Sequence, residues 1–342
     1  MLDDEKYVEQ LDRSNALAII AGQADQLKQR YEYQLPDKEG IQNIVVAGMG
    51  GSALAAEFVR SWTSDQLSLP ITIVRDYSLP AFVSEDSLVI IYSYSGNTEE
   101  TLSALESARK AKAKLVLVSS GGKLQELAAK NQYCYIQIPE GIQPRLAVLF
   151  GVKALIDLLE RLDLLNGSVK ELEGQADWAR QEVSYFTLSI KTAENTAKQI
   201  AEKLVGFTPV IYSGPALAMP ALKWKIDINE NAKNLAFYNQ QPEFSHNEFM
   251  GWLNPTDKPF RVVQLTSKLD HPQIKKRFEV TARLLSGKMP APIAVEAQGE
   301  TKLQQMLWTM LLGDFVSAYL AFLNGVDPTP VDLIEKLKKE LP

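Results

Sequence analysis

The stretch from Leu88 to Leu102, which reads LVIIYSYSGNTEETL, decides the fold class. Its first five residues are apolar or aromatic, and a short run of this kind favours a fully buried strand. Small polar residues follow directly, and Glu99 and Glu100 supply the acidic first turn that is typical of a helix start. A strand, a polar loop and a helix start in succession predict an α/β unit, and open α/β sheets bind ligands at such loops.

The loop after this strand has the donors that a phosphate group requires. Ser93, Ser95 and Thr98 carry hydroxyls, and backbone N–H groups at a helix N-terminus attract anions. No lysine or arginine lies in the loop, which favours a single phosphate over a triphosphate with its magnesium. The alternative is an ordinary strand-to-helix turn capped by Thr98.

A second turn with the same organisation lies upstream. Residues 44–47 predict a strand, and Gly48-Met-Gly-Gly-Ser52 follows it. A helix is expected at 53–62. Glycines permit a tight turn and a close approach of the backbone to a ligand. Residue 53 is alanine, which breaks the dinucleotide-binding spacing, so nucleotide binding is disfavoured. Further strands are predicted at 71–74, 115–118 and 133–138.

The second half of the chain repeats the succession of strand, glycine turn and helix, in PVIYSGPALAMPALKW from Pro209. We therefore predict an α/β protein of two similar subdomains, each a mostly parallel sheet flanked by helices. The expected division is 1–150 and 151–342, the latter beginning with a helical connection and ending with helices at 302–323 and 331–340. A helical lead-in is expected at about 3–33.

Composition limits the kinds of partner. The net charge is −6, which argues against nucleic acid or an anionic membrane surface. The single cysteine, Cys134, excludes an internal disulfide and is expected to lie buried in a strand. The N-terminus is acidic without an apolar signal core, and no run is expected to span a membrane. These features predict a reduced, cytoplasmic location.

Few side chains are candidates for acid–base chemistry. Of the two histidines, His246 lies in a polar, turn-rich segment and His271 is expected at a helix start or turn. His246 could equally be a structural histidine. Glu230 ends an amphipathic stretch and could be a solvated charge. Arg145 lies between a strand end and a helix, where either a surface arginine or a ligand-facing cation would fit.

Several motifs in one order carry a resemblance to a known family. They span most of the chain: Gly48-Met-Gly-Gly-Ser52, Ser93-Tyr-Ser-Gly-Asn-Thr-Glu-Glu-Thr101, Asn229-Glu-Asn-Ala-Lys233, Pro242-Glu-Phe-Ser-His-Asn-Glu248, Gly313-Asp-Phe-Val-Ser317 and Gly325-Val-Asp-Pro-Thr-Pro-Val331. Together they resemble the bifunctional phosphoglucose/phosphomannose isomerases of the sugar isomerase (SIS) superfamily. The Asn-Glu and His-Asn segments are the more specific signals, because a serine-rich loop alone indicates only a sugar-phosphate-binding module.

The resemblance implies an aldose–ketose isomerase of carbohydrate metabolism, in glycolysis and gluconeogenesis. It would interconvert fructose 6-phosphate with glucose 6-phosphate and mannose 6-phosphate through a cis-enediol, without a cofactor or a metal. The resemblance also assigns the residues that would bind the substrate and its phosphate, which are Gly50, Gly51, Ser52, Ser93, Ser95 and Thr98.

Four catalytic residues are implied in the same way. Glu230 would move the proton between C1 and C2, and Arg145 would lie against the enediolate. His246, donated by the other subunit of a homodimer, and Lys302 would assist ring opening. These roles agree with general chemistry, because proton abstraction beside a carbonyl needs a positioned carboxylate and the oxyanion needs a fixed cation.

Two alternatives differ in function class. One is a non-catalytic SIS sensor, which would keep the serine loop but would not need Glu230, His246 and Arg145 together. The chain shows no helix-turn-helix segment or basic face that would contact DNA. The other is an SIS enzyme of amino-sugar metabolism, but no glutaminase segment with an N-terminal cysteine is present.

Overall fold

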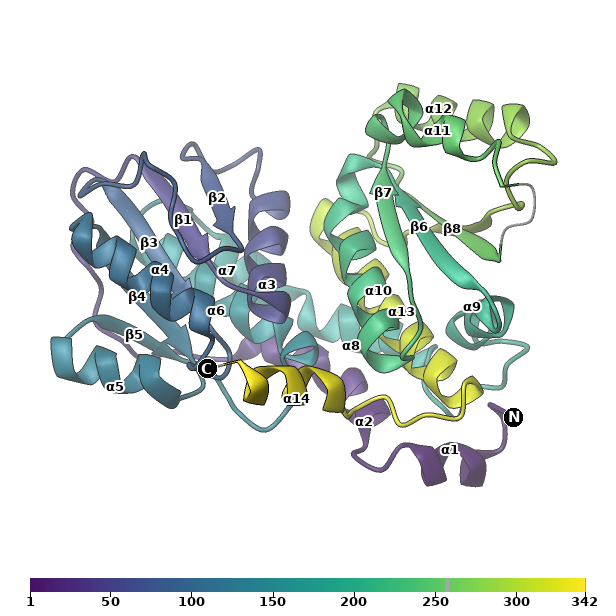
Figure 1. Ribbon diagram of the computed structural model, residues 1–342, viewed down its shortest axis with the longest axis horizontal. Helices are drawn as coiled ribbons and strands as arrows, with labels where there is room; N and C mark the ends of the chain where they lie inside the picture. The colour runs from purple at the N-terminus through teal and green to yellow at the C-terminus, as the bar shows by residue number, and fades with distance from the viewer. Residues whose placement is uncertain (256–258, 342) are drawn as a thin grey trace. The chain divides into compact units, whose positions relative to one another are not determined.

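The computed structural model describes residues 1–255 and 259–341 and contains two compact units (Figure 1). Unit A comprises Gly22–Trp178, and unit B comprises Met1–Ala21 together with Ala179–Pro342. Each unit is an α/β assembly around one sheet, as the sequence predicts. The division expected at residue 150 stays a prediction.

The sheet of unit A has five parallel strands in the order β2-β1-β3-β4-β5. The strands are β1 (Asn43–Ala47), β2 (Ile71–Val74), β3 (Ser87–Tyr92), β4 (Lys114–Ser119) and β5 (Cys134–Gln137). Every residue of β3 is buried, as its unbroken apolar run predicts. The chain leaves β1 toward one edge and later returns to the other side of it, so a topological switch point lies between β1 and β3.

Helices cover both faces of this sheet. One face packs its alternate residues against α4 (Glu99–Lys110) and α5 (Gly122–Asn131). The other face carries α3 (Gly50–Trp62) and α6 (Val148–Arg161), which pack against each other. A Cβ on Gly151 of α6 would lie 2.4 Å from the Tyr92 hydroxyl oxygen, so a glycine is needed for this approach. The remaining elements are η1 (Gly22–Lys28), η2 (Pro144–Leu146), α7 (Ser168–Gly174) and α8 (Ala176–Ser184), which runs on into unit B.

Unit B contains a four-stranded parallel sheet in the order β7-β6-β8-β9. Its strands are β6 (Thr208–Ser213), β7 (Phe237–Gln240), β8 (Phe260–Thr266) and β9 (Ile293–Glu296). The sequence analysis did not predict β7, because this edge strand exposes both of its aromatic side chains and shows no apolar alternation. The helical elements of unit B are α1 (Glu5–Leu11), α2 (Ala16–Ala21), α9 (Thr196–Leu204), η3 (Pro215–Leu217), α10 (Ala218–Asn231), η4 (Glu243–His246), α11 (Glu248–Gly251), α12 (Pro272–Leu284), α13 (Lys302–Leu323) and α14 (Asp332–Glu340).

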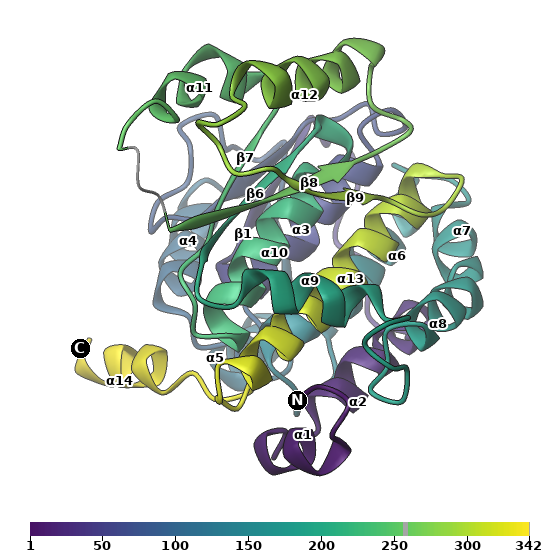
Figure 2. The same ribbon diagram turned by 90° about the vertical axis from the view of Figure 1, so that its right-hand side faces the viewer.

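The central helix of unit B is α13, which runs beside α10 (Figure 2). A capping box between Thr301 and Gln304 starts it. The sequence analysis expected no run of membrane-spanning length, but α13 is long and apolar enough to cross a membrane. However, 94% of its apolar window is buried inside the protein, so α13 is a core helix of this fold.

A buried charge cluster joins α10 to α13. The Lys223 ammonium donates to Asp227 at 2.7 Å and to Asp314, and all three side chains are fully buried. Burial raises the pKa of Asp227 well above its ordinary value, and the Asp314 charge adds to the rise although Lys223 opposes it.

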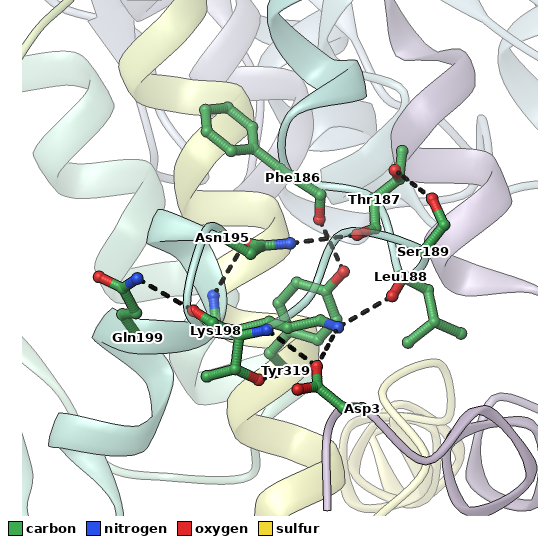
Figure 3. Close-up of polar contacts among 10 residues, drawn as sticks. Asp3, Phe186, Thr187, Leu188, Ser189, Asn195, Lys198, Gln199 and Tyr319 are labelled. Carbon is green, nitrogen blue, oxygen red and sulfur yellow. Dashed lines mark hydrogen bonds and ion pairs between the residues drawn. The ribbon is translucent and has the colours of Figure 1, made fainter.

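The N-terminal residues of unit B are held by a buried lysine (Figure 3). The Lys198 ammonium donates to Asp3 at 3.0 Å and to the Leu188 carbonyl at 2.9 Å, and it lies 5.6 Å from the Tyr319 ring centroid. Burial works to raise the pKa of Asp3, but hydrogen bonds from Lys198 and Thr192 outweigh it and lower that pKa to about 2. The chain start is thereby tied to α9 and α13.

Other local predictions are confirmed in full or in part. Cys134 is buried in β5. His271 is the N-cap of α12, where its Nδ1 accepts from the Gln273 N–H at 3.1 Å. The helical lead-in is interrupted, since α1, α2 and η1 are separate short elements and η1 ends at Lys28.

Candidate active site

The glycine turn and the serine loop both lie at the carboxyl edge of the unit A sheet. The turn follows β1 and opens α3, and the loop follows β3 and opens α4. Two helix N-termini therefore point at the switch point between β1 and β3, where their unpaired N–H groups favour an anion. This is the position at which open α/β sheets bind ligands.

The serine loop is held in shape by its own hydroxyls. Ser93 Oγ and Thr98 Oγ1 lie 2.7 Å apart, and the Thr98 N–H donates to Ser93 Oγ at 3.4 Å. Thr98 occupies the N-cap position of α4, yet its side chain makes no capping hydrogen bond. Thr98 is thus the N-cap residue that the alternative of an ordinary turn expects, but its hydroxyl is paired with Ser93 Oγ and does not cap the helix. Ser95 is exposed at the loop tip, where its Oγ accepts from the Asn97 N–H at 3.3 Å.

Ser52 joins the glycine turn to the serine loop. Its side chain is buried in the first turn of α3, and Ser52 Oγ accepts from the Tyr94 N–H at 3.1 Å. Gly50 has a φ of +50°, a left-handed conformation that glycine adopts without strain. The substrate-binding residues expected in this unit are thus gathered at one edge of one sheet.

Arg145 lies beside the same turn and is buried. It sits in η2 with a relative exposure of 1%, and its Nη1 donates to Gln143 Oε1 at 3.2 Å. The surface-arginine alternative is therefore wrong. A Cβ on Gly51 would lie 2.4 Å from the Pro144 carbonyl oxygen and 3.0 Å from the Arg145 nitrogen. Gly51 is the residue that lets the arginine segment approach the start of α3.

The other three candidates lie in unit B. Glu230 is in the last turn of α10 and lines a cavity of about 680 Å³. His246 ends η4 and is exposed, which disfavours a buried structural role. Lys302 is the first residue of α13.

The segment that carries His246 is anchored on both sides. Phe244 is buried with its ring centroid 4.6 Å from that of Tyr212 on β6. Glu248 accepts from the Tyr212 hydroxyl and from Asn239 Nδ2, the latter at 2.6 Å. The Glu248 carboxylate therefore anchors the segment through these two hydrogen bonds.

Unit B does not bring Glu230 and His246 together. The parallel strands β6 and β7 are joined through α10, so α10 runs from the carboxyl edge of the sheet back to the amino edge. Glu230, in the last turn of α10, therefore lies at the amino edge, whereas His246 follows the carboxyl end of β7. The 14 residues of α10 correspond to a separation of about 20 Å.

The sequence analysis missed Lys233, whose ammonium contacts four backbone carbonyls. The one signal for it was its place at the end of the Asn229–Lys233 motif. Within residues 1–255 and 259–341, no group of three His, Cys, Asp or Glu side chains could hold a metal ion.

Comparisons with known proteins match both units. Residues 40–155 match the model of the SIS domain, and residues 193–341 match the model of the bacterial phospho-glucose isomerase C-terminal SIS domain. A bifunctional phosphoglucose/phosphomannose isomerase from Aquifex aeolicus is 37% identical over 303 residues, which are 88% of this chain and 90% of that protein. The chain belongs to this family.

A second member of the family, from Caldicellulosiruptor bescii, is 36% identical over 307 residues and covers 89% of this chain and 90% of its own length. The crystal structure of a glucose-6-phosphate isomerase like protein from Thermus thermophilus superimposes with a TM-score of 0.65 at 18% identity, covering 99% of this chain and 98% of that one. The family resemblance and the fold class expected from the sequence are both confirmed.

Proposed function

We propose that this chain is an aldose–ketose isomerase that interconverts fructose 6-phosphate with glucose 6-phosphate and mannose 6-phosphate. The observation that carries the proposal is the anion cradle at the switch point of unit A, in a chain of the phosphoglucose/phosphomannose isomerase family. Ser52, Ser93, Ser95 and Thr98 would hold the phosphate, with the N–H groups of the turn at Gly50 and Gly51. The enzyme would act in the cytoplasm, in glycolysis and gluconeogenesis.

The proton transfer is assigned to Glu230. Its carboxylate takes the proton from C2 of the open-chain aldose and returns it to C1, while the hydroxyl proton passes from O2 to O1 of the cis-enediol. Arg145 stabilises the developing oxyanion, because a buried guanidinium keeps its charge and has a fixed orientation. His246 and Lys302 assist ring opening. None of these steps calls on a cofactor or a metal.

We further propose a homodimer with shared active sites. The placement of Glu230 and His246 at opposite edges of the unit B sheet supports this arrangement, because one copy of unit B cannot present both to one substrate. Mixing inactive Glu230→Gln protein with inactive His246→Ala protein should restore part of the activity if subunits exchange. Each variant incubated alone is the control, and a fully active monomer at micromolar concentration would contradict the dimer.

A coupled assay on fructose 6-phosphate, read separately for the two aldose products, tests the function. We expect both glucose 6-phosphate and mannose 6-phosphate to form. Binding of the sugar phosphate without turnover to either product would favour the sensor alternative.

A further inference from the structure

The end of α10, which carries Glu230, is held by a lysine side chain. The last carbonyls of a helix lack intrahelical donors and need other partners. Lys233 follows the helix in a left-handed conformation with a φ of +51°. Its ammonium turns back and donates to the Glu230 carbonyl at 2.9 Å and to the Asn231 carbonyl at 3.2 Å. A cation at this end also complements the helix dipole.

The same ammonium binds a segment that is distant in the sequence. It donates to the Asp327 carbonyl at 2.8 Å and to the Pro328 carbonyl at 3.0 Å. Three N–H bonds are thus shared among four carbonyls, two from the helix end and two from the link between α13 and α14. A further tie comes from Asn324 Nδ2, which donates to the Ala232 carbonyl at 3.1 Å.

The two segments that Lys233 joins both line one cavity. Glu230 and Lys233 line it from the helix end, and Asp327 and Pro330 line it from the link. The lysine therefore lies where the helix end that carries Glu230 meets the link, at the edge of this cavity.

We propose that Lys233 is a positioning residue for Glu230, which it serves by tying the end of α10 to the 326–330 link. The inference rests on the proposed role of Glu230 as the base. Lys233 itself does not touch the substrate; it sets where the Glu230 backbone lies relative to the 326–330 link.

The rest of α10 has its own anchors, so this role is separable from folding. Trp224 Nε1 donates to the Thr309 carbonyl at 2.7 Å, and Lys223 joins the buried cluster with α13. Both contacts lie at least one turn before Glu230, and directly after it the buried Asn231 Nδ2 donates to Ser317 Oγ of α13 at 2.8 Å. Loss of Lys233 is therefore expected to leave the helix docked and to displace the carbonyls at its end and the link that they face.

The experiment compares Lys233→Met with Lys225→Met, a matched change on a half-buried lysine of the same helix. A misplacement of about 1 Å can cost about 10²-fold in rate, so kcat for fructose 6-phosphate should fall about 10- to 100-fold in Lys233→Met. KM should change little, because the phosphate is held in unit A. Lys225→Met should keep both constants. If Lys233→Met does not fold, Lys233→Gln is measured against the same criteria.

Chemical rescue separates positioning from a general loss of structure. Lys233 is exposed and the single native cysteine is buried, so 2-bromoethylamine should alkylate the Lys233→Cys variant selectively. The product restores an ammonium at nearly the original reach, and kcat should recover. A kcat of Lys233→Met equal to that of Lys225→Met, or no recovery after complete alkylation, would overturn the inference.

Turnover by Glu230→Gln distinguishes a wrong assignment of the base from a wrong positioning role for Lys233. If Glu230→Gln retained wild-type turnover, the assignment of the base would be wrong whatever Lys233→Met did. If Glu230→Gln were inactive and Lys233→Met fully active, the base assignment would stand and the positioning role would not.

Discussion

Replacement of Gly51 by alanine tests how the arginine is placed against the glycine turn. The new Cβ would lie 2.4 Å from the Pro144 carbonyl oxygen, whereas ordinary contacts begin at 3.4 Å, so Pro144 and Arg145 must retreat by about 1 Å. Such a displacement of a cation that stabilises the transition state should lower kcat by about 10²-fold. Overpacking should also cost about 1–3 kcal/mol of unfolding free energy, so the assay is run well below the melting temperature.

The measurements are kcat and KM in the coupled assay and the affinity for a phosphorylated sugar acid by calorimetry. Because the hydroxyls of the serine loop are untouched, affinity should fall much less than kcat. Gly174→Ala is the control, since a Cβ there meets nothing within 4 Å and the residue ends a helix of the same unit. Turnover of Gly51→Ala at the rate of Gly174→Ala would refute the assignment of Arg145.

Three further predictions concern the buried lysine, the N-terminal anchor and the phosphate loop. Lys223→Met leaves buried carboxyls without their cation and should cost about 3–5 kcal/mol in denaturant unfolding, whereas Lys225→Met should cost little. The pKa of Asp3 is lowered from 3.8 to about 2, so its stabilising effect is present above pH 3.8 and is lost toward pH 2. The difference in melting temperature between wild type and Asp3→Asn should shrink over that range, and a constant difference would exclude this linkage. Ser95→Ala and Thr98→Ala should each weaken sugar-phosphate binding by about 1–3 kcal/mol per lost charge-assisted hydrogen bond. Unchanged affinity by calorimetry would show that the loop does not bind the phosphate.

The fold could be predicted wherever apolar runs alternate with turn residues. The continuous apolar run of β3 and the glycine turn after β1 indicate buried parallel strands, and both are found. The short edge strand β7 could not be recognised in this way. Phe237 and Tyr238 point to solvent, and its pairing with β6 depends on a partner 27 residues away in the sequence.

The candidate site was predictable in its residue types but not in its contacts. The hydroxyls of the serine loop lie within six residues of one another in the sequence, so the local fold of the loop brings them together at one edge. The burial of Arg145 depends on the close approach that Gly51 permits, more than 90 residues away. The contact of Lys233 with the Asp327 carbonyl spans 94 residues, and no local pattern reports such a contact.

The most direct test of the account is the exchange of solvent deuterium into C1 of fructose 6-phosphate by wild type and by Glu230→Gln. The substitution keeps the size and hydrogen bonding of the side chain but removes the basic oxygen, so affinity for the sugar phosphate should survive. Loss of a general base costs about 10²–10⁴-fold in rate, and label incorporation should fall by that factor. Incorporation by Glu230→Gln at the wild-type rate would show that another residue carries the proton.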